Sequence, residues 1–141
     1  MAKQLYIYED ARPITAARHR DWSVKTGTDF GFAKDLNACP ILAAEFSEAA
    51  RHLPIVFVGS EDTVMPIAVL GARDRQNVFV DGDGRWTGGY LPAFLRQYPF
   101  VLAQTGEENK VALCVDEAYG GCNTEGRGER LFDSEGNRTR Y

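Results

Sequence analysis

The chain has 141 residues, of which 44% are hydrophobic and 26% are charged, and its formal net charge at pH 7 is −4. This composition is that of an ordinary globular protein and excludes the disordered and fibrous classes. Residues 1–70 carry seven Lys or Arg against nine Asp or Glu, and residues 71–141 carry nine against eleven. Because neither half is basic, we do not expect a dedicated nucleic-acid binder. The length suits a single domain with a sizeable core.

The N-terminus and the cysteines indicate the cellular compartment. Residues 1–10 lack the basic-then-apolar order of a signal peptide, and no apolar run approaches the roughly 20 residues that cross a bilayer. The cysteines are odd in number and form no CxxC pair, which argues against a disulfide framework and a zinc site. We therefore expect a cytoplasmic protein with reduced thiols, no cofactor and no metal. Cys39 and Cys114 lie among apolar residues and are expected in the core, whereas Cys122 is not.

The first half of the chain predicts one strand, an irregular segment and one helix. Residues 4–8 alternate polar and apolar side chains, as in a short strand. Residues 16–22 could form one or two helical turns before glycines interrupt them. Apolar residues then recur near a period of 3.6 and predict a helix over 43–52, which Pro54 ends and His52 closes. Three aromatic side chains of the irregular segment are expected to fold onto the core: Trp22, Phe30 and Phe32.

The second half predicts mostly strands joined by short polar connections, which favours antiparallel hairpins. The expected strands are residues 55–58, 66–70, 77–80, 100–104 and 110–116, with a last strand and turn over 131–136. A short helix is expected over 91–98, with Pro92 in its first turn and Pro99 at its end. Residues 118–130 are glycine-rich and polar, hence a loop. The expected fold class is α+β, with a mainly antiparallel sheet and a few short helices.

Two segments, 78–85 and 130–137, share an apolar pair followed by Asp-x-acid-Gly. The acidic residues suggest calcium loops, but an EF-hand loop continues with further oxygen ligands, and Arg85 stands where such a ligand would be. The pattern also suits hairpin turns whose glycine takes a positive φ. We predict two similar turns rather than metal sites. The acidic residues concerned are Asp81, Asp83, Asp133 and Glu135.

His19 and Cys122 are the candidates for chemistry outside the aromatic region. His19 lies between Arg18 and Arg20, so it could belong to an anion site, although a solvated, charged turn with a buried Trp22 explains the same residues and is favoured. Cys122 follows two glycines that could expose its thiol. The two histidines are too distant in sequence to support or exclude a Cys–His pair. The chain contains no GxSxG, P-loop, GxGxxG or HExxH motif.

The segment 85–100 concentrates aromatic residues between two prolines. Tyr90, Phe94 and Tyr98 follow one another at i, i+4 and i+8, which places them on one helical face and predicts a core contact. The alternative is a ligand platform, with Trp86 and Arg96 at the rim of an apolar pocket. The residues that this alternative nominates for ligand binding are Trp86, Tyr90 and Arg96, with His19 as a further candidate.

Five segments are distinctive when taken together: the apolar segments 54–58, 66–71 and 77–81, and the aromatic segments 84–86 and 90–100. In these segments the chain resembles the SapC family of bacterial proteins, and the resemblance covers nearly the whole chain. The family takes its name from a surface-layer gene cluster, and its members often accompany genes for outer-membrane receptors and flavin-dependent halogenases. It implies no established reaction and no catalytic residues. The resemblance implies a single SapC-like domain over 1–141. SapC proteins are usually longer, which leaves three interpretations of this chain: a truncated product, a fragment, or a short member of the family.

The resemblance and the missing motifs together favour a non-enzymatic accessory or binding protein of the surface layer or of outer-membrane uptake. The alternative is a small-molecule enzyme or ligand sensor whose pocket lies near Trp86, Tyr90 and Arg96. A third hypothesis is a homo-oligomeric structural component, since a shortened chain would expose apolar surface. The expected partner is an unknown protein or small molecule.

Overall fold

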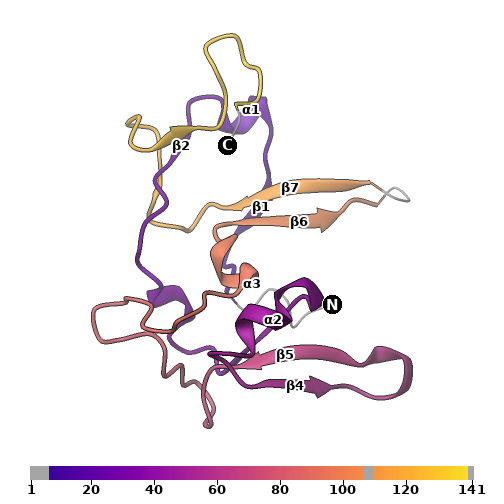
Figure 1. Cartoon of the computed structure of the whole chain (residues 1–141). Helices are drawn as coiled ribbons and strands as arrows, with labels where there is room; N and C mark the ends of the chain where they lie inside the picture. The colour runs from indigo at the N-terminus through magenta and orange to yellow at the C-terminus, as the bar shows by residue number, and fades with distance from the viewer. Residues whose placement is uncertain (1–6, 107–109, 140–141) are drawn as a thin grey trace. The chain divides into compact units, whose positions relative to one another are not determined.

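The computed structural model describes residues 7–106 and 110–139, which divide into two compact units. Unit 1 contains Ile7 and Thr28–Gln97, and unit 2 contains Tyr8–Gly27 and the described part of Tyr98–Tyr141 (Figure 1). Each unit is therefore built from segments that are separated in the sequence. That the two units form one domain over 1–141 stays a prediction.

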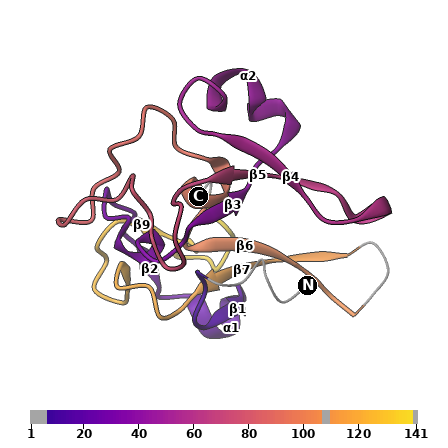
Figure 2. The same ribbon diagram turned by 90° about the horizontal axis from the view of Figure 1, so that it is seen from below.

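Unit 1 is organised around a three-stranded antiparallel sheet in the order β3-β5-β4. The strands are β3 (Ala38–Pro40), β4 (Ile55–Val58) and β5 (Met65–Val69). The 3₁₀ turn η3 (Ala43–Glu45) leads into α2 (Phe46–Ala49), which lies beside the β4–β5 hairpin (Figure 2). The remaining elements are the helix α3 (Ala93–Arg96) and the 3₁₀ turns η2 (Gly31–Ala33) and η4 (Glu61–Thr63). The buried core consists of Ala33, Cys39, Ile41, Ala49, Leu53, Ala68, Leu70 and Leu95.

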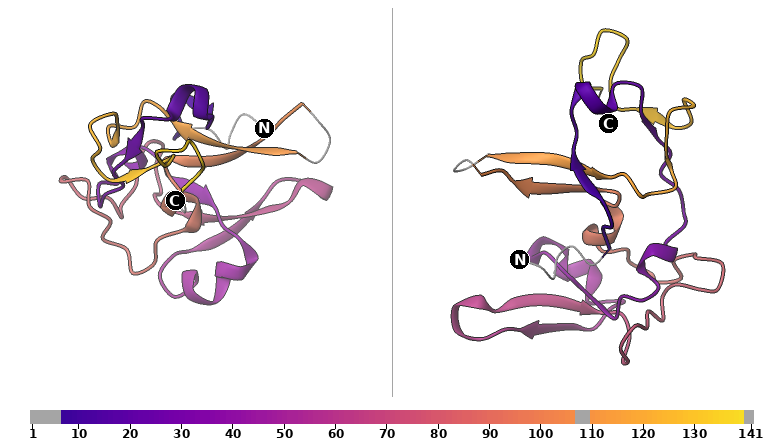
Figure 3. Two further views of the ribbon diagram at one scale, coloured as in Figure 1. Left: turned by 90° about the horizontal axis from the view of Figure 1, so that it is seen from above. Right: turned by 180° about the vertical axis from the view of Figure 1, so that it is seen from behind.

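Unit 2 contains two three-stranded antiparallel sheets. The first has the order β1-β7-β6, with β1 (Ala11–Pro13), β6 (Phe100–Gln104) and β7 (Val111–Asp116), and β6 and β7 form a long hairpin (Figure 3). The second has the order β8-β2-β9, with β2 (Ser23–Val24), β8 (Cys122–Asn123) and β9 (Glu129–Arg130). The helix α1 (Ala16–His19) lies between β1 and β2 in sequence. The buried core consists of Val24, Val115, Leu131 and Phe132.

The α+β class and the mainly antiparallel pairing are confirmed, as are the strands expected over 55–58, 66–70, 100–104 and 110–116. The helix expected over 43–52 is present but shorter, because η3 precedes α2 and only turns follow it. Partial burial against the cores is also confirmed for Trp22 in unit 2 and Phe32 in unit 1. Phe30 is partly buried against Phe32 and Trp86.

The strand expected over 77–80 is wrong, since these residues form a turn and only Val80 makes an isolated bridge, to Trp86. The reason is the buried Asn77 side chain. Its Oδ1 accepts the Phe79 N–H at 2.9 Å and its Nδ2 donates to the Ala33 carbonyl at 3.0 Å. A side chain that bonds the backbone in this way folds the chain locally and competes with a ladder.

Three further expectations change. Residues 4–6 of the first expected strand lie outside the described residues, and Ile7 and Tyr8 are not in a strand. The loop expected over 118–130 contains the short strands β8 and β9, because both pair with β2. The strand expected at 131–132 is a single bridge between Phe132 and Arg138.

Candidate functional site

Glu45 is the centre of the polar cluster in unit 1, although it is only 8% exposed. Its Oε1 accepts the Tyr90 hydroxyl at 2.7 Å and the Ala93 N–H at 2.8 Å, and its Oε2 accepts the Leu42 N–H at 2.9 Å. Leu42 immediately precedes η3, and Ala93 begins α3. One carboxylate therefore supplies acceptors at the starts of two helical segments, where backbone N–H groups lack partners of their own.

The charge of Glu45 is stabilised by these donors. Burial alone would raise the pKa of its carboxyl group, but the hydrogen bonds from Leu42, Ala93 and Tyr90 and the nearby charge of Arg96 outweigh burial, and the pKa lies below its ordinary value. The same contact raises the pKa of Tyr90. At neutral pH the pair is thus a carboxylate and a protonated phenol, and the phenol is the donor.

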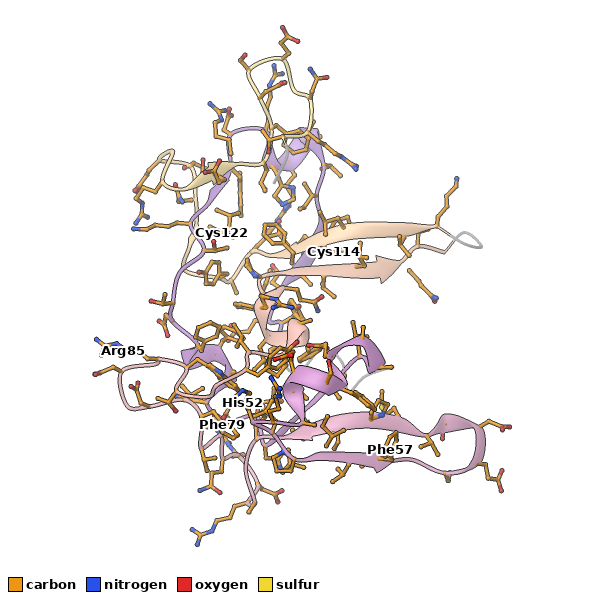
Figure 4. All side chains as sticks on the ribbon, viewed as in Figure 1. His52, Phe57, Phe79, Arg85, Cys114 and Cys122 are labelled. Atoms are coloured by element: carbon orange, nitrogen blue, oxygen red, sulfur yellow. The ribbon has the colours of Figure 1, made fainter. Side chains whose placement is uncertain are left out.

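Trp86 joins this cluster through the Tyr90 main chain. Its Nε1 donates to the Tyr90 carbonyl at 3.1 Å, and its ring lies 5.4 Å from that of Phe79. A Cβ at Gly88 would lie 2.8 Å from Trp86 Nε1, and one at Gly89 would lie 2.3 Å from a ring nitrogen of the exposed His52. The two glycines therefore let both rings pack directly against the main chain. Figure 4 labels His52 and Phe79.

The structure thus brings together the predicted residues Trp86 and Tyr90, and Arg96 lies near both Tyr90 and Glu45. Arg96 is exposed at the end of α3, so it is the member of the cluster most accessible to a ligand. We call Glu45, Trp86, Tyr90 and Arg96 the Glu45 cluster. Sequence reasoning missed Glu45. The spacing of three residues from Leu42 at a helix start, as in a capping box, is the signal that could have found it.

The helical face expected for Tyr90, Phe94 and Tyr98 is not formed, because α3 spans only Ala93–Arg96 and both tyrosines lie outside it. Tyr98 belongs to unit 2, where its ring lies 5.4 Å from that of Tyr8 and 5.3 Å from that of Tyr119. Burial raises its pKa, and the neighbouring charge of Asp116 raises it further. Tyr90 and Phe94 pack against the core of unit 1, whereas Tyr98 is partly buried against the aromatic rings of unit 2.

Asp116 is the fully buried carboxylate of unit 2, and sequence reasoning missed it as well. Oδ1 accepts the Asp10 N–H at 2.9 Å and the Ala118 N–H at 3.2 Å, and Oδ2 accepts the Glu9 N–H at 3.0 Å and the Tyr98 hydroxyl at 3.1 Å. Asp116 ends the apolar strand β7, so the position of an acid after buried residues was the available signal. The carboxylate ties three backbone segments together.

His19 lies in unit 2, not in the unit that holds the Glu45 cluster. The expectation of a solvated turn is wrong for His19, which is completely buried. Its Nδ1 accepts the Thr15 N–H at 3.2 Å, and its Nε2 lies 3.0 Å from Glu117 Oε1. Arg18 binds both oxygens of the same carboxylate, and this contact holds the pKa of Glu117 below its ordinary value against the effect of burial. The histidine thus closes the α1 turn onto Glu117.

The cysteines follow the expected division. All three are free, Cys39 and Cys114 are buried and Cys122 is half-buried. Cys122 Sγ lies 3.5 Å from the Asp116 carbonyl, and burial, assisted by the neighbouring acids, raises the pKa of its thiol to about 11. Burial raises the pKa of Cys39 to about 12. These two thiols are therefore protonated at neutral pH, whereas a nucleophilic cysteine is a thiolate.

The two acidic turns have the same hydrogen bonds. Asp81 Oδ1 accepts the N–H groups of residues 83 and 85 at 2.9 Å, and Asp133 Oδ1 accepts those of residues 135 and 137 at 2.9 and 2.8 Å. Gly84 and Gly136 have φ of 77° and 86°, as predicted for such turns. Asn123 repeats the pattern with residues 125 and 127. Within the described residues no group of three or more His, Cys, Asp or Glu is placed to hold a metal ion.

Apolar side chains are exposed on the long hairpins of both units. On β4 and β5 the exposed side chains include Val56 (39%), Phe57 (64%), Val58 (39%) and Met65 (40%). On β6 and β7 they are Leu102 (65%), Val111 (61%) and Leu113 (41%). In Figures 1 and 3 the β4–β5 hairpin extends beyond α2, and Figure 4 labels Phe57 on it. These strands present apolar surface that their own unit leaves in contact with water.

Comparison with known proteins gives one match. A model of the SapC family matches residues 14–141. No curated protein and no solved structure matches the chain significantly. In the part of the chain that the structure describes, no helix has the length and apolar character needed to cross a membrane.

Proposed function

The chain belongs to the SapC family, and from this premise we propose that it is a non-enzymatic accessory protein of the bacterial cytoplasm that binds a protein partner in surface-layer formation or outer-membrane uptake. The observation that carries the binding role is the exposed apolar surface of the β4–β5 and β6–β7 hairpins. Contiguous apolar surface is costly in water, at about 25 cal/mol per Å², and commonly marks an interaction site.

The non-enzymatic part of the proposal is supported by how the polar groups are engaged. Both oxygens of Glu45 and of Asp116 accept hydrogen bonds from within their own unit. The thiol of Cys122 is protonated at neutral pH. A general base or nucleophile must reach a substrate, whereas the carboxylates of Glu45 and Asp116 are buried and hydrogen-bonded within the fold.

The test is photo-cross-linking in cells of the source bacterium. A photoreactive residue is placed at Leu102 or Met65, which are exposed and apolar, and at Asp74 as a polar exposed control. We expect the first two positions to cross-link to one envelope-related protein and Asp74 not to do so. Equal labelling at all three positions would contradict a specific surface. A substrate whose turnover depends on one side chain would contradict the non-enzymatic role.

A second candidate function is small-molecule binding at the Glu45 cluster. It is favoured by the exposed Arg96, which lies near the half-buried Tyr90, whose carbonyl in turn accepts the Trp86 Nε1–H. Arg96 would bind an anionic group and Trp86 an apolar or aromatic body. Native mass spectrometry of protein purified from its source tests this. A retained small molecule that is lost in Arg96→Ala but kept in Arg73→Ala supports it, and its retention in both variants contradicts it.

A further inference from the structure

β4 is an edge strand with an open side. It pairs only with β5 among the described strands, and the order β3-β5-β4 leaves its other edge unpaired. Val69 N–H bonds the Pro54 carbonyl at 2.9 Å, so the hydrogen-bonded positions toward β5 are 54, 56 and 58. The carbonyl of Pro66, opposite Phe57, bonds Ile41 on the other side. The backbone groups of Ile55 and Phe57 therefore point to the open edge.

The open edge lacks the usual protection against pairing. Natural edge strands carry lysine, proline or a bulge, or are covered. Ile55–Val58 contains no charged residue and no proline, and its pairing with β5 is regular over all four residues. Phe57 lies on the face toward α2, with its ring 6.2 Å from that of Phe46, and Val56 and Val58 point to the opposite face. Residues 56–58 are all exposed, so a new strand meets an accessible apolar edge.

The charges at the two ends of β4 select its partner. Arg51 and His52 precede the strand, Glu61 and Asp62 follow it, and all four are exposed. A second β4 laid antiparallel places the basic end of one copy beside the acidic end of the other, whereas a parallel arrangement places like charges together. For the two strands to hydrogen-bond, the backbone N–H and C=O groups of Ile55 and Phe57 in one copy must face the same groups in the other. The register that achieves this with Val56 opposite its own counterpart pairs Ile55 with Phe57. Residues 51–53 and 59–62 lie in turns on either side of the strand, so the basic residues of one copy and the acidic residues of the other meet at the ends of the strand pair.

We propose that β4 is a self-association surface, and that its occupant is β4 of a second copy, joined antiparallel about a two-fold axis at Val56. The two three-stranded sheets then form one continuous sheet. The inference deepens the proposed function and rests on it in one respect, since both treat the exposed hairpins as binding surfaces. A strand added at an edge gains main-chain hydrogen bonds, and the end charges fix its direction.

The test is sedimentation velocity over a wide concentration range on the full chain. We expect a concentration-dependent dimer. Val56→Lys places two ammonium groups opposite each other and should weaken the dimer at least tenfold (~1.4 kcal/mol). Val78→Lys, the same exchange at an exposed position outside both hairpins, should leave it unchanged. Arg51→Glu and Glu61→Arg should each weaken the dimer several-fold, and the double variant should restore it. Unchanged thermal unfolding of each variant, measured at a concentration at which wild type is monomeric, confirms that the fold is kept.

Three results would overturn the proposal: a monomer at every concentration, a dimer that tolerates Val56→Lys, or a double charge reversal as weak as the single ones. The outcome is separable from that of the proposed function. A monomer that still cross-links to a cellular partner through Leu102 leaves the accessory role standing and removes self-association. A charge-specific dimer with no cellular cross-link supports self-association and contradicts the accessory role.

Discussion

The two units share a hydrogen-bonded carboxylate and differ in how deeply it is buried. Each buries a carboxylate that accepts backbone N–H groups and one tyrosine hydroxyl, and both tyrosines come from the aromatic segment 85–100. Asp116 in unit 2 is fully buried and accepts three backbone N–H groups. Glu45 in unit 1 accepts two and lies near the exposed Arg96. Asp116 is therefore shielded from solvent, whereas Glu45 lies close to a charged side chain at the surface.

The acidic turns are a second feature that the two units have in common. Unit 1 contains one Asp-x-acid-Gly turn and unit 2 another, and both follow the same hydrogen-bond pattern. Arg85 lies in the first turn (Figure 4), where the second has Asn137. The two turns thus show that one short motif specifies the same local structure in two different surroundings.

The largest expected effect is on Asp116. Asp116→Asn places an N–H₂ group where two donors now meet an oxygen, so we expect the free energy of unfolding to fall by about 3 kcal/mol or more. Glu45→Gln should cost less, about 2 kcal/mol, because that carboxylate is nearer to the surface. Urea denaturation measures both. Asp74→Asn is the exposed control and should change stability by less than about 0.5 kcal/mol. Equal costs for Asp116→Asn and Asp74→Asn would contradict the role of the buried carboxylate.

Substitution of the tyrosines tests the same hydrogen bonds by removing the donor instead of the carboxylate acceptor. Tyr90→Phe and Tyr98→Phe each remove a hydrogen bond to a carboxylate at little cost in packing, and each should lower the free energy of unfolding by about 1.5 kcal/mol. Double-mutant cycles with Glu45→Gln and Asp116→Asn measure the pairs. We expect coupling within Glu45–Tyr90 and within Asp116–Tyr98. Coupling of either tyrosine to the other unit's carboxylate would contradict the claim that each carboxylate acts only within its own unit.

The turns should show a smaller effect of equal size in both units. Asp81→Ala and Asp133→Ala each remove an oxygen that accepts two N–H groups, and each should cost about 1 kcal/mol. The matched variants Asp81→Asn and Asp133→Asn should be nearly neutral, since Asn123 naturally makes the same pair of bonds. Thermal unfolding measures the four variants. A cost for asparagine as large as that for alanine would show that charge, not the turn, is what matters.

The pH dependence of Glu45 should be the smallest effect. Its pKa in the folded protein lies below the ordinary value of 4.5, so the folded state favours the ionised form. The stability it contributes is fully present above about pH 4.5 and is lost as the pH falls through the folded pKa. The free energy of unfolding of Glu45→Gln should therefore depend less on pH in the acidic range than that of wild type. Identical acid dependence in the two proteins would contradict the assignment.

Sequence patterns predicted the strands at 55–58 and 110–116, which are rich in β-branched and apolar residues, and both acidic turns, which carry the residues typical of turns. They failed where one side chain redirects the main chain. Asn77 turns an apolar run that reads as a strand, and a β-branched pattern does not reveal this. Trp86 and Tyr90 are in contact, but Glu45 and Asp116 were missed, because several of their donors are far away in sequence. Tyr90 and Ala93 lie 45 and 48 residues from Glu45, and Asp10 and Glu9 lie 106 and 107 residues from Asp116. A carboxylate whose hydrogen-bond donors are distant in sequence is not marked by any pattern in the residues next to it.

Hydrogen exchange of Tyr90→Phe and Tyr98→Phe tests most directly the claim that each unit is held by its own carboxylate. Tyr90→Phe should speed exchange of the Leu42 and Ala93 N–H groups and leave that of Asp10 and Ala118 unchanged, and Tyr98→Phe should do the reverse. Faster exchange of all four groups in both variants would contradict the claim.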